Sequence, residues 1–385
     1  MNKKICVVTG SRADYGLLRP VLRELVAAPD LNLQVIAAGM HLAPEFGLTF
    51  RDIEADGFVI NRKVEMLLSS DSRSAVAKSM GLGMIGFADA LHDLSPDLLL
   101  LLGDRFEIFS AAATALIACV PVAHLHGGET TEGAFDEAIR HSITKMSHLH
   151  FVAAEEYRQR VIRMGEHPDC VFNVGGLGVD NISQLKLLGL AELERSLGIS
   201  LGDKNLLITF HPATLEPESA ARQMEELLAA LRLLTDTTLL FTMPNADTEG
   251  RRLMGIIEAF VDSHPKAHVF VSMGVTRYLS CMKWVDGVVG NSSSGLTEAP
   301  SFRVGTVNIG DRQRGRLKAT SVIDCEPERD QISAAIRRLY TSDFRTLLPQ
   351  VVNPYGDGGA SRRIVEIIRA YSLEGLLKKT FYDPS

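Results

Sequence analysis

The sequence predicts an α/β protein with two successive domains, each a doubly wound parallel β-sheet, and a central cleft. Three observations lead to this prediction. Short apolar runs alternate with helical patterns, the runs are continuously apolar, and the series starts again near the middle of the chain. Continuous apolar runs are typical of parallel strands that helices cover on both faces, and 385 residues are enough for two ordinary domains.

The first series of strands lies in the N-terminal half. A β-branched run at residues 5–8 is followed by Thr9-Gly10-Ser11 and by a helical pattern over 17–26, which is the order of a strand–turn–helix unit. The five consecutive leucines at 98–102 predict a fully buried strand. The strands expected in this half are residues 5–8, 34–37, 98–102 and 120–124.

The second series repeats this order. Its strands are expected at residues 206–210, 238–241, 269–271, 287–289 and 305–309. The glycine-rich stretch GGLGVD at 175–180 predicts the boundary between the domains. We therefore expect an N-terminal domain over 1–175, a C-terminal domain over 176–360, and a helical segment over 361–385 that packs back on the first domain.

Charge and composition exclude several classes of protein. Lysine and arginine number 40 against 47 aspartates and glutamates, a net charge of −7 that offers no field for binding nucleic acid. No run approaches the roughly 20 apolar residues of a membrane span, and the first residues lack the apolar core of a signal peptide. We expect a cytoplasmic protein with no membrane partner, whose five scattered cysteines are reduced.

Polar side chains follow the predicted strands at their carboxyl ends. In an open parallel sheet, ligands bind beyond these ends, so we expect the polar groups of both domains to line one cleft. His41 and Asn245 are candidate substrate-binding residues on this ground. The polar residues that follow strands include Ser11, Arg12, Asp14, His41, Asp104, His124, His126, Glu129, His211 and Asn245.

The segment GNSSSGLTEAPS at residues 290–301 is the clearest ligand-binding pattern. Small residues let a backbone approach a phosphate closely, and the N–H groups and dipole at a helix start favour an anion. Glu298, about one turn further along, is expected to bind ribose hydroxyls. The alternative is an ordinary serine cap of the helix. The residues expected at the helix start are Ser292, Ser293, Ser294 and Gly295.

A group of carboxylates near two strand ends forms a second pattern. Acid–base chemistry on a sugar needs a proton acceptor and a proton donor, and carboxyl groups can serve as either. The structural alternative for Asp104 is to cap the helix that begins near residue 105. The members of the group are Asp104, Glu129, Asp136 and Glu137.

Two short patterns do not support a bound metal or dinucleotide. HLH at 124–126 and again at 148–150 has the spacing of a metal pair, but neither has a third ligand at a usual distance, so we expect no metal. GLGMIG at 81–86 matches GxGxxG, but it lies inside a helical pattern and does not follow a strand, as a dinucleotide site requires.

Longer motifs resemble those of a known family. They are GSRADYG (10–16), GMH (39–41), LLGDRFEIFSAA (101–112), HLHGGETTEGAFDEAIRHSITKMSHLH (124–150), FHP (210–212), NADT (245–248), GNSSSGLTEAPS (290–301) and NIGDRQRGR (308–316). In this order, over nearly the whole chain, they resemble the hydrolysing UDP-N-acetylglucosamine 2-epimerases, in particular those of bacterial sialic and legionaminic acid synthesis. The resemblance implies a GT-B fold of two Rossmann-like domains, a UDP-sugar substrate, UDP and a free 2-epimeric sugar as products, no cofactor, and a homodimer.

The resemblance also implies roles for single residues. Asp104 and Asp136 are then catalytic, with Glu129 or a neighbour as their partner. Many relatives carry a glutamate where His126 stands, so either His126 or Glu129 takes over that acid–base task. The residues implied to hold the nucleotide diphosphate are Arg12, His211, Ser292, Ser293, Ser294, Gly295 and Glu298. Those implied near the phosphates or the moving domain edge are Arg312, Gln313 and Arg316.

The substrate and the reaction class leave alternatives. UDP-N-acetylglucosamine and UDP-N,N'-diacetylbacillosamine differ at C4 and C6, and the motifs do not choose between them. A GT-B glycosyltransferase would share the UDP site but need an acceptor, and a sensor would bind UDP without turnover. A non-hydrolysing epimerase would return a UDP-sugar instead of free UDP.

Overall fold

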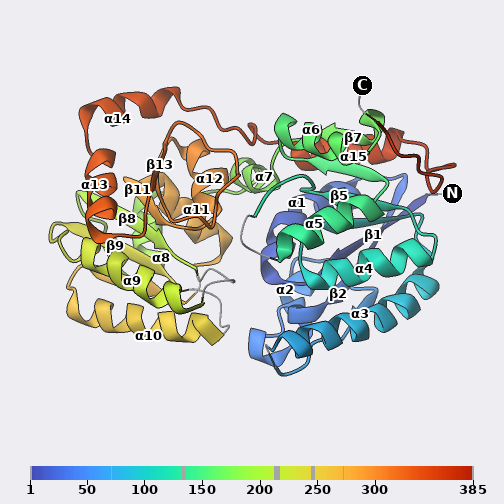
Figure 1. Ribbon diagram of the computed structural model, residues 1–385, viewed down its shortest axis with the longest axis horizontal. Helices are drawn as coiled ribbons and strands as arrows, with labels where there is room; N and C mark the ends of the chain where they lie inside the picture. The colour runs from blue at the N-terminus through green and yellow to red at the C-terminus, as the bar shows by residue number, and fades with distance from the viewer. Residues whose placement is uncertain are drawn as a thin grey trace. The chain divides into compact units, whose positions relative to one another are not determined.

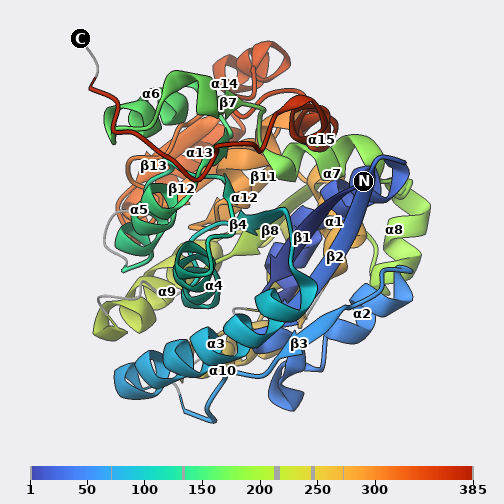
Figure 2. The ribbon, with the colours of Figure 1, turned by 90° about the vertical axis from the view of Figure 1, so that its right-hand side faces the viewer.

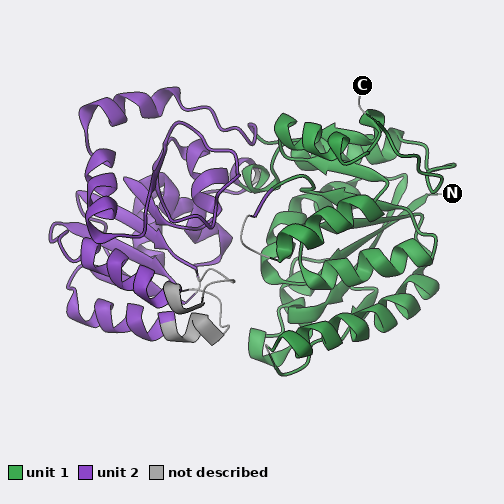
Figure 3. Cartoon of the chain, viewed as in Figure 1, with its two compact units in different colours: residues 1–129, 135–181, 358–385 green, residues 130–134, 182–357 purple. Residues whose placement is uncertain are grey.

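The computed structural model (Figures 1 and 2) describes residues 2–70, 72–131, 135–211, 217–243, 248–271 and 273–383. The chain divides into two compact units (Figure 3). Unit 1 comprises Met1–Glu129, Phe135–Asn181 and Gly358–Ser385, and unit 2 comprises Thr130–Ala134 and Ile182–Asp357. The chain leaves unit 1 for unit 2 within helix α7 (Leu177–Gln184).

Unit 1 is built on a parallel sheet in the strand order β3-β2-β1-β4-β5-β6-β7. The order reverses between β1 and β4, and this reversal is the switch point where ligands bind in such sheets. The strands are β1 (Lys3–Thr9), β2 (Leu31–Ala38), β3 (Arg62–Val64), β4 (Leu98–Leu102), β5 (Val122–Leu125), β6 (Leu149–Val152) and β7 (Val171–Asn173).

Helices cover both faces of the unit 1 sheet, which is why its central strands are continuously apolar. Alternate side chains of β1 enter two separate cores: Ile5 packs with residues of α1 and α15, while Cys6 packs with residues of α3 and α4. Figure 2 shows α1 on one side of this sheet and α3 and α4 on the other. The helices are α1 (Arg12–Ala27), α2 (Phe50–Ala55), α3 (Arg73–Leu94), α4 (Phe106–Ile117), α5 (Asp136–Met146), α6 (Glu155–Arg163) and α15 (Ala360–Ala370).

The C-terminal segment belongs to unit 1. Asp180 caps α15 by accepting hydrogen bonds from the N–H groups of Ala360 and Ser361 at 2.8 and 2.6 Å. Lys3 of β1 donates to the carbonyl oxygen of Tyr371 at 2.8 Å, just beyond the end of the helix. The tail continues to α6 (Figure 2). There the N–H of Tyr382 donates to the carbonyl oxygen of Gly165 at 3.0 Å.

Unit 2 is built on a second parallel sheet, in the order β10-β9-β8-β11-β12-β13, which reverses between β8 and β11. Leu206 and Leu207 of β8 again enter cores on opposite faces. The strands are β8 (Lys204–Thr209), β9 (Thr237–Thr242), β10 (Ala267–Phe270), β11 (Gly287–Gly290), β12 (Gly305–Ile309) and β13 (Val322–Cys325). The helices are α8 (Leu190–Leu197), α9 (Pro217–Leu231), α10 (Thr248–Ser263), α11 (Gly274–Trp284), α12 (Ser294–Thr297), α13 (Arg329–Leu339) and α14 (Ser342–Leu347).

These two doubly wound sheets confirm the predicted fold class. Four strands were missed, namely β3, β6, β7 and β13, because each has only three or four residues and includes polar ones such as Arg62 or Asp324. The GxGxxG stretch lies inside α3, as its helical pattern predicts. In the part of the chain that the structure describes, no helix has both the length and the apolar character needed to cross a bilayer.

Candidate active site

Asp104 lies at the switch point of unit 1, directly after β4. Its carboxylate forms an ion pair with the guanidinium of Arg140 from α5, whose side chain is only 3% exposed. The N-cap of α4 is Arg105 and makes no side-chain capping bond, so the capping alternative for Asp104 does not apply. The side chain of Asp104 is 24% exposed, which leaves its carboxylate accessible at the edge of the sheet.

Arg140 gathers three acidic segments around one buried guanidinium. Besides Asp104, it bonds to the carboxylate of Glu137 at 3.2 Å and to the backbone carbonyl of Glu129 at 3.1 Å. An arginine presents several donors in a fixed planar arrangement and stays charged when buried. Arg140 therefore ties the segment after β4, the loop after β5 and helix α5 together, and sequence reasoning did not assign it a role.

His126 and Glu129 form a histidine–carboxylate pair in the loop after β5. Nδ1 of His126 lies 3.0 Å from Oε1 of Glu129, which is 5% exposed. Nε2 of His126 accepts a hydrogen bond from the N–H of Leu177 at 3.3 Å, so in the neutral ring the proton is on Nδ1 and is donated to Glu129. The pair offers a histidine and a carboxylate in direct contact, which is an arrangement that can transfer protons.

Asp136 is the first residue of α5, and its carboxylate helps to raise the pKa of Arg105. Burial lowers the pKa of Arg105, but the carboxylates of Glu107, Asp14 and Asp136 together raise it above its ordinary value. Arg105 and Glu107 are part of the GDRFE motif, yet sequence reasoning gave them no role. A basic residue flanked by two acidic ones, directly after a strand at the switch point, was the available signal.

His124 and His126 do not form a metal pair. His126 has a left-handed backbone conformation, with φ of 63°, so the alternation of the strand stops at Leu125. The buried ring of His124 donates from Nε2 to the carbonyl of Gly103 at 2.8 Å, and its Nδ1 contacts the hydroxyl of Thr144 at 3.1 Å. Burial lowers the pKa of His124 to about 3, so its neutral ring links the turn before Asp104 to α5.

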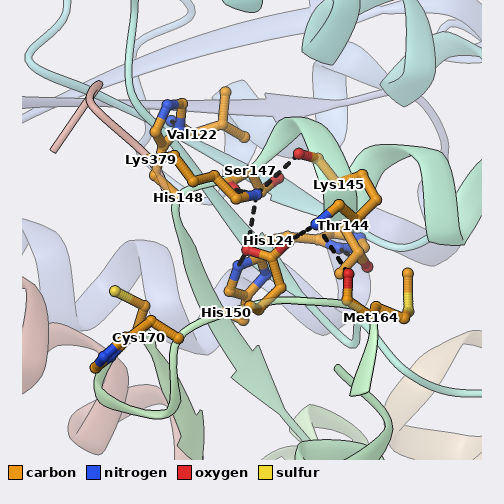
Figure 4. A network of polar contacts seen from close by, with 12 residues as sticks. Val122, His124, Thr144, Lys145, Ser147, His148, His150, Met164, Cys170 and Lys379 are labelled. Atoms are coloured by element: carbon orange, nitrogen blue, oxygen red, sulfur yellow. Dashed lines mark hydrogen bonds and ion pairs between the residues drawn. The ribbon is translucent and has the colours of Figure 1, made fainter. Parts of the chain in front are cut away.

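The second HLH motif belongs to a structural network at the far end of α5 (Figure 4). Nδ1 of His148 accepts from the N–H of Val122 at 3.1 Å, and Nε2 of His150 lies 2.9 Å from the carboxylate of Glu166. Glu166 also binds the ammonium groups of Lys145 and Lys379 at 2.6 and 2.7 Å. Within the described ranges, no three histidine, cysteine, aspartate or glutamate side chains are grouped so that they could hold a metal ion.

In unit 2, Asn291 joins the two strand ends at the switch point. Its side chain accepts from the N–H of His211 at 2.7 Å and donates to the carbonyl of His211 at 2.8 Å. Gly290, just before it, has φ of 140°, and a Cβ there would lie 2.0 Å from the carbonyl oxygen of Thr209, so only glycine fits. Burial and Arg312 lower the pKa of His211 to about 3, which makes its ring neutral.

The serine-rich segment lies next to these residues and forms a chain of hydroxyl groups. Oγ of Ser294 is 3.1 Å from Oγ of Ser292 and 2.5 Å from the hydroxyl of Tyr278, on α11. Tyr278 also lies 3.4 Å from the hydroxyl of Thr209 at the end of β8. Each hydroxyl can donate or accept, so the chain can adapt to an anion. Tyr278 lies in none of the sequence motifs, and only the fold places its hydroxyl beside Ser294.

The helix at this segment is a single turn. α12 covers only four residues, Ser294–Thr297, and a 3₁₀ turn follows from Ala299. A Cβ on Gly295 would lie 2.6 Å from a methyl carbon of Thr306, so this glycine allows α12 to pack on β12. Burial raises the pKa of Glu298 to about 7 at the junction of the two turns.

Two of three polar residues after β12 contact the end of β11. Arg312 and Gln313 both donate to the carbonyl oxygen of Asn291, at 3.2 and 2.8 Å. Arg316 instead donates to the carbonyl of Thr130 at 3.1 Å, on the short segment that belongs to unit 2. Arg312 and Gln313 therefore lie beside His211 and the serine segment, whereas Arg316 holds a chain segment.

Three further residues predicted to bind the substrate or its nucleotide do not lie in either of these groups. Arg12 is exposed, and its Nε lies 4.0 Å from the carboxylate of Asp52, which is too far for a hydrogen bond. Its guanidinium is therefore accessible. His41 is fully buried, with its ring nitrogens 2.9 and 2.8 Å from the hydroxyls of Thr9 and Thr49. This leaves His41 no nitrogen for a ligand, so we give it a structural role. Asn245 lies outside the described residues.

Comparison with known proteins gives the family. Residues 23–369 match the protein family described as UDP-N-acetylglucosamine 2-epimerase. The chain is 41% identical over 385 residues to the GDP/UDP-N,N'-diacetylbacillosamine 2-epimerase (hydrolyzing) of Campylobacter jejuni, covering 99% of both chains. It is 37% identical to the UDP-N,N'-diacetylbacillosamine 2-epimerase (hydrolyzing) of Legionella pneumophila, covering 97% of both.

A solved structure supports the fold. The UDP-GlcNAc 2-epimerase of Neisseria meningitidis, bound to UDP-GlcNAc, matches with a TM-score of 0.83 at 18% identity, covering 96% of this chain and all of that one. The comparisons confirm the resemblance seen in the motifs. The chain belongs to the UDP-N-acetylglucosamine 2-epimerase family, and its enzyme class is that of the hydrolysing 2-epimerases.

Proposed function

We propose that this protein converts a UDP-linked 2-acetamido sugar to UDP and the free 2-epimeric sugar, with UDP-N,N'-diacetylbacillosamine as the preferred substrate. The observation that carries the proposal is the group of acidic residues held by Arg140 at the switch point of unit 1. The names of the Campylobacter and Legionella relatives support the choice of substrate. UDP-N-acetylglucosamine is the alternative substrate.

We assign nucleotide binding to unit 2. A diphosphate needs hydrogen-bond donors and positive charge, and Arg312 and the serine hydroxyls supply both next to the end of β8. Glu298 is assigned to the ribose hydroxyls, which a carboxyl group can bind in either protonation state. The residues of unit 2 proposed to hold UDP are His211, Ser292, Ser293, Ser294, Gly295, Glu298, Arg312 and Gln313, with Arg316 supporting the adjacent chain. Arg12 of unit 1 is proposed as a further ligand of the diphosphate.

We assign the chemistry to unit 1. No carbonyl acidifies the proton on C2 of the sugar, so its removal must be driven by departure of the diphosphate from C1. Groups that stabilise the leaving phosphate lower this barrier, while Asp104 or a neighbouring carboxylate takes the C2 proton. Elimination gives a glycal, water then adds at C1, and a proton returns to C2 on the opposite face. Asp136 and the His126–Glu129 pair are the other candidate acids and bases.

The test is a reaction in D2O with the UDP-sugar as sole substrate. We expect phosphorus NMR to show free UDP, and proton NMR to show a free sugar that carries deuterium at C2. A glycosyltransferase would release little free sugar without an acceptor, and a non-hydrolysing epimerase would leave the phosphorus in a UDP-sugar. Unlabelled free sugar would contradict the elimination step.

A competition between two substrates tests the sugar specificity. We expect UDP-N,N'-diacetylbacillosamine to be consumed first from an equal mixture with UDP-N-acetylglucosamine. Sites that pair with a substrate's polar groups can discriminate by about 10⁴-fold when such a group is missing. Equal consumption of both sugars would contradict the assigned preference without affecting the reaction class.

The homodimer and the cytoplasmic location also belong to this proposal. Helices α3 and α4 expose apolar side chains next to each other, including Ile85 at 67% and Ile117 at 81% exposure. They flank a cavity of about 730 Å³ lined by Met84, Leu91, Ile117 and Val120, among others. Exposed apolar surface of this kind is typical of protein contacts. We propose that a second copy of this chain covers the face formed by α3 and α4.

Charged substitutions on this face test the dimer. We expect the double variant Ile85→Lys/Ile117→Lys to elute as a monomer in size-exclusion chromatography with light-scattering detection. Dimer formation would bury two unpaired charges and remove their hydration, which costs free energy. The control is Val59→Lys, which places the same charge on another exposed apolar side chain of unit 1. A wild-type monomer, or an unchanged dimer in the double variant, would refute this interface.

A further inference from the structure

A second buried group of charges lies at the switch point of unit 1. Arg105 donates from Nε and Nη2 to the two carboxylate oxygens of Glu107 at 3.2 and 3.0 Å. The side chain of Glu107 is fully buried, and a Cβ on Gly39 would lie only 2.8 Å from its Cγ. Both oxygens of Glu107 are thus used by Arg105, and this carboxylate positions the guanidinium.

Asp14 is the carboxyl group in this cluster whose bonding is incomplete. It lies in the first turn of α1, just beyond the end of β1, the strand beside β4. Its Oδ2 is buried and has no hydrogen-bond partner among the described residues. The groups that act on the carboxyl of Asp14 are Arg105, Glu107 and Asp104 through their charges, and Ser11 through a side-chain hydrogen bond. Asp14 therefore places a buried, unpaired carboxyl oxygen near the residue to which we assign proton removal.

A purely structural role does not account for this oxygen. An acidic residue in the first turn of a helix usually accepts from free backbone N–H groups there. In α1 the N–H of Asp14 already donates to the hydroxyl of Ser11 at 3.3 Å, and no described backbone N–H donates to the carboxyl of Asp14. A buried polar atom without a partner destabilises the fold, so one retained next to an active site calls for a functional explanation.

We propose that Asp14 is a further catalytic residue, the acid that returns a proton to C2 of the glycal. This proposal rests on the hydrolysing epimerase function proposed above. In the step, the electrons of the C1=C2 double bond take the proton of the Asp14 carboxyl and form the C2–H bond. The oxygen of a water molecule bonds to the resulting cationic C1, and its excess proton passes to solvent. The Asp14 carboxylate then regains a proton from solvent.

The surroundings of Asp14 suit a proton donor. Burial raises its pKa to about 6, against the opposing effect of Arg105. An acid whose pKa lies near the working pH can both release and regain its proton. Asp104 is ion-paired with the buried Arg140, so the two carboxyl groups have different partners, as an acid and a base in one site require.

The test separates the two halves of the reaction in Asp14→Asn. We expect this variant to release UDP but to form free sugar at least about 100-fold more slowly than the wild type. The glycal should then accumulate and be visible by its C1 vinyl proton in NMR. Glycal isolated from this reaction, added as the probe, should be hydrated by the wild type and not by the variant.

Two variants serve as controls. Asp14→Glu keeps an acid and should restore part of the hydration, and Glu156→Gln removes an exposed carboxylate of α6 and should match the wild type. If Asp14 only supports the fold, UDP release and sugar formation will fall together without glycal, and the proposal is overturned. Should Asp14→Asn not fold, Asp14→Ser carries the same test. A wild type that releases no UDP would instead overturn the proposed function.

Discussion

Asp104→Asn is expected to lower turnover by about 10²–10⁴-fold while leaving the affinity for UDP nearly unchanged. General acid–base groups contribute rate factors of this size, and an amide cannot accept the C2 proton. UDP binding should persist because the proposed nucleotide-binding residues, apart from Arg12, belong to unit 2, whereas Asp104 belongs to unit 1. Turnover is followed by UDP release, and UDP affinity by calorimetry.

A reciprocal variant and a surface control complete this experiment. Glu298→Gln, at the proposed ribose site, should weaken UDP binding, whereas Asp93→Asn, an exposed carboxylate on α3, should change neither quantity. In Asp104→Asn the amide oxygen of the new side chain can still accept from Arg140, so thermal unfolding should show an intact unit 1. A large loss of UDP affinity in this variant would contradict the division of roles between the units.

Glu166→Gln is expected to destabilise unit 1 by about 2–4 kcal/mol. Removing the acidic partner of a buried ion pair typically costs about 3–5 kcal/mol, and the partial exposure of Lys145 and Lys379 reduces this range. The variant leaves two ammonium groups beside a neutral amide. Lys379 belongs to the C-terminal tail, so hydrogen exchange followed by mass spectrometry should show faster exchange in residues 371–383 as well as in β6.

The effect should depend on pH in a defined direction. Burial raises the pKa of Glu166, but the opposing effect of His150, Lys145 and Lys379 is larger. The net result is a pKa lowered from 4.5 to about 2. A lowered pKa in the folded state stabilises above pH 4.5, and this stabilisation is lost as the pH falls from 4.5 to 2. Glu166→Gln should lose less stability across that window than the wild type. Glu155→Gln, at an exposed ion pair, is the matched control, and equal acid sensitivity in both variants would refute the assignment.

The candidate site could be predicted only where its residues carry a local pattern. The serine-rich segment after β11 and the carboxylate after β4 stand at strand ends, and strand ends are visible in the sequence. Arg140 is 36 residues from Asp104, and Tyr278 is 16 residues from Ser294 on another helix. No periodicity connects such pairs, because their contact depends on which helix the fold places over which strand end.

The histidine motifs show the same limit in another form. The alternation of a strand predicts that His124 and His126 share a face, but the left-handed conformation at His126 turns its ring to Glu129. The network of Glu166 joins β6, α5 and the C-terminal tail. Its members are separated by up to 234 residues, so the sequence shows only isolated charged side chains.

The sequence by itself determined the two doubly wound sheets and the family, because strands buried on both faces must be continuously apolar, and long motifs preserve their order along the chain. The tertiary structure decided which polar groups meet. Strand order brings the ends of β1 and β4 together, and with them Asp14, Arg105 and Asp104. Burial and charge pairing act through space, so the properties of these side chains follow from their neighbours in the fold and not from their neighbours in the chain.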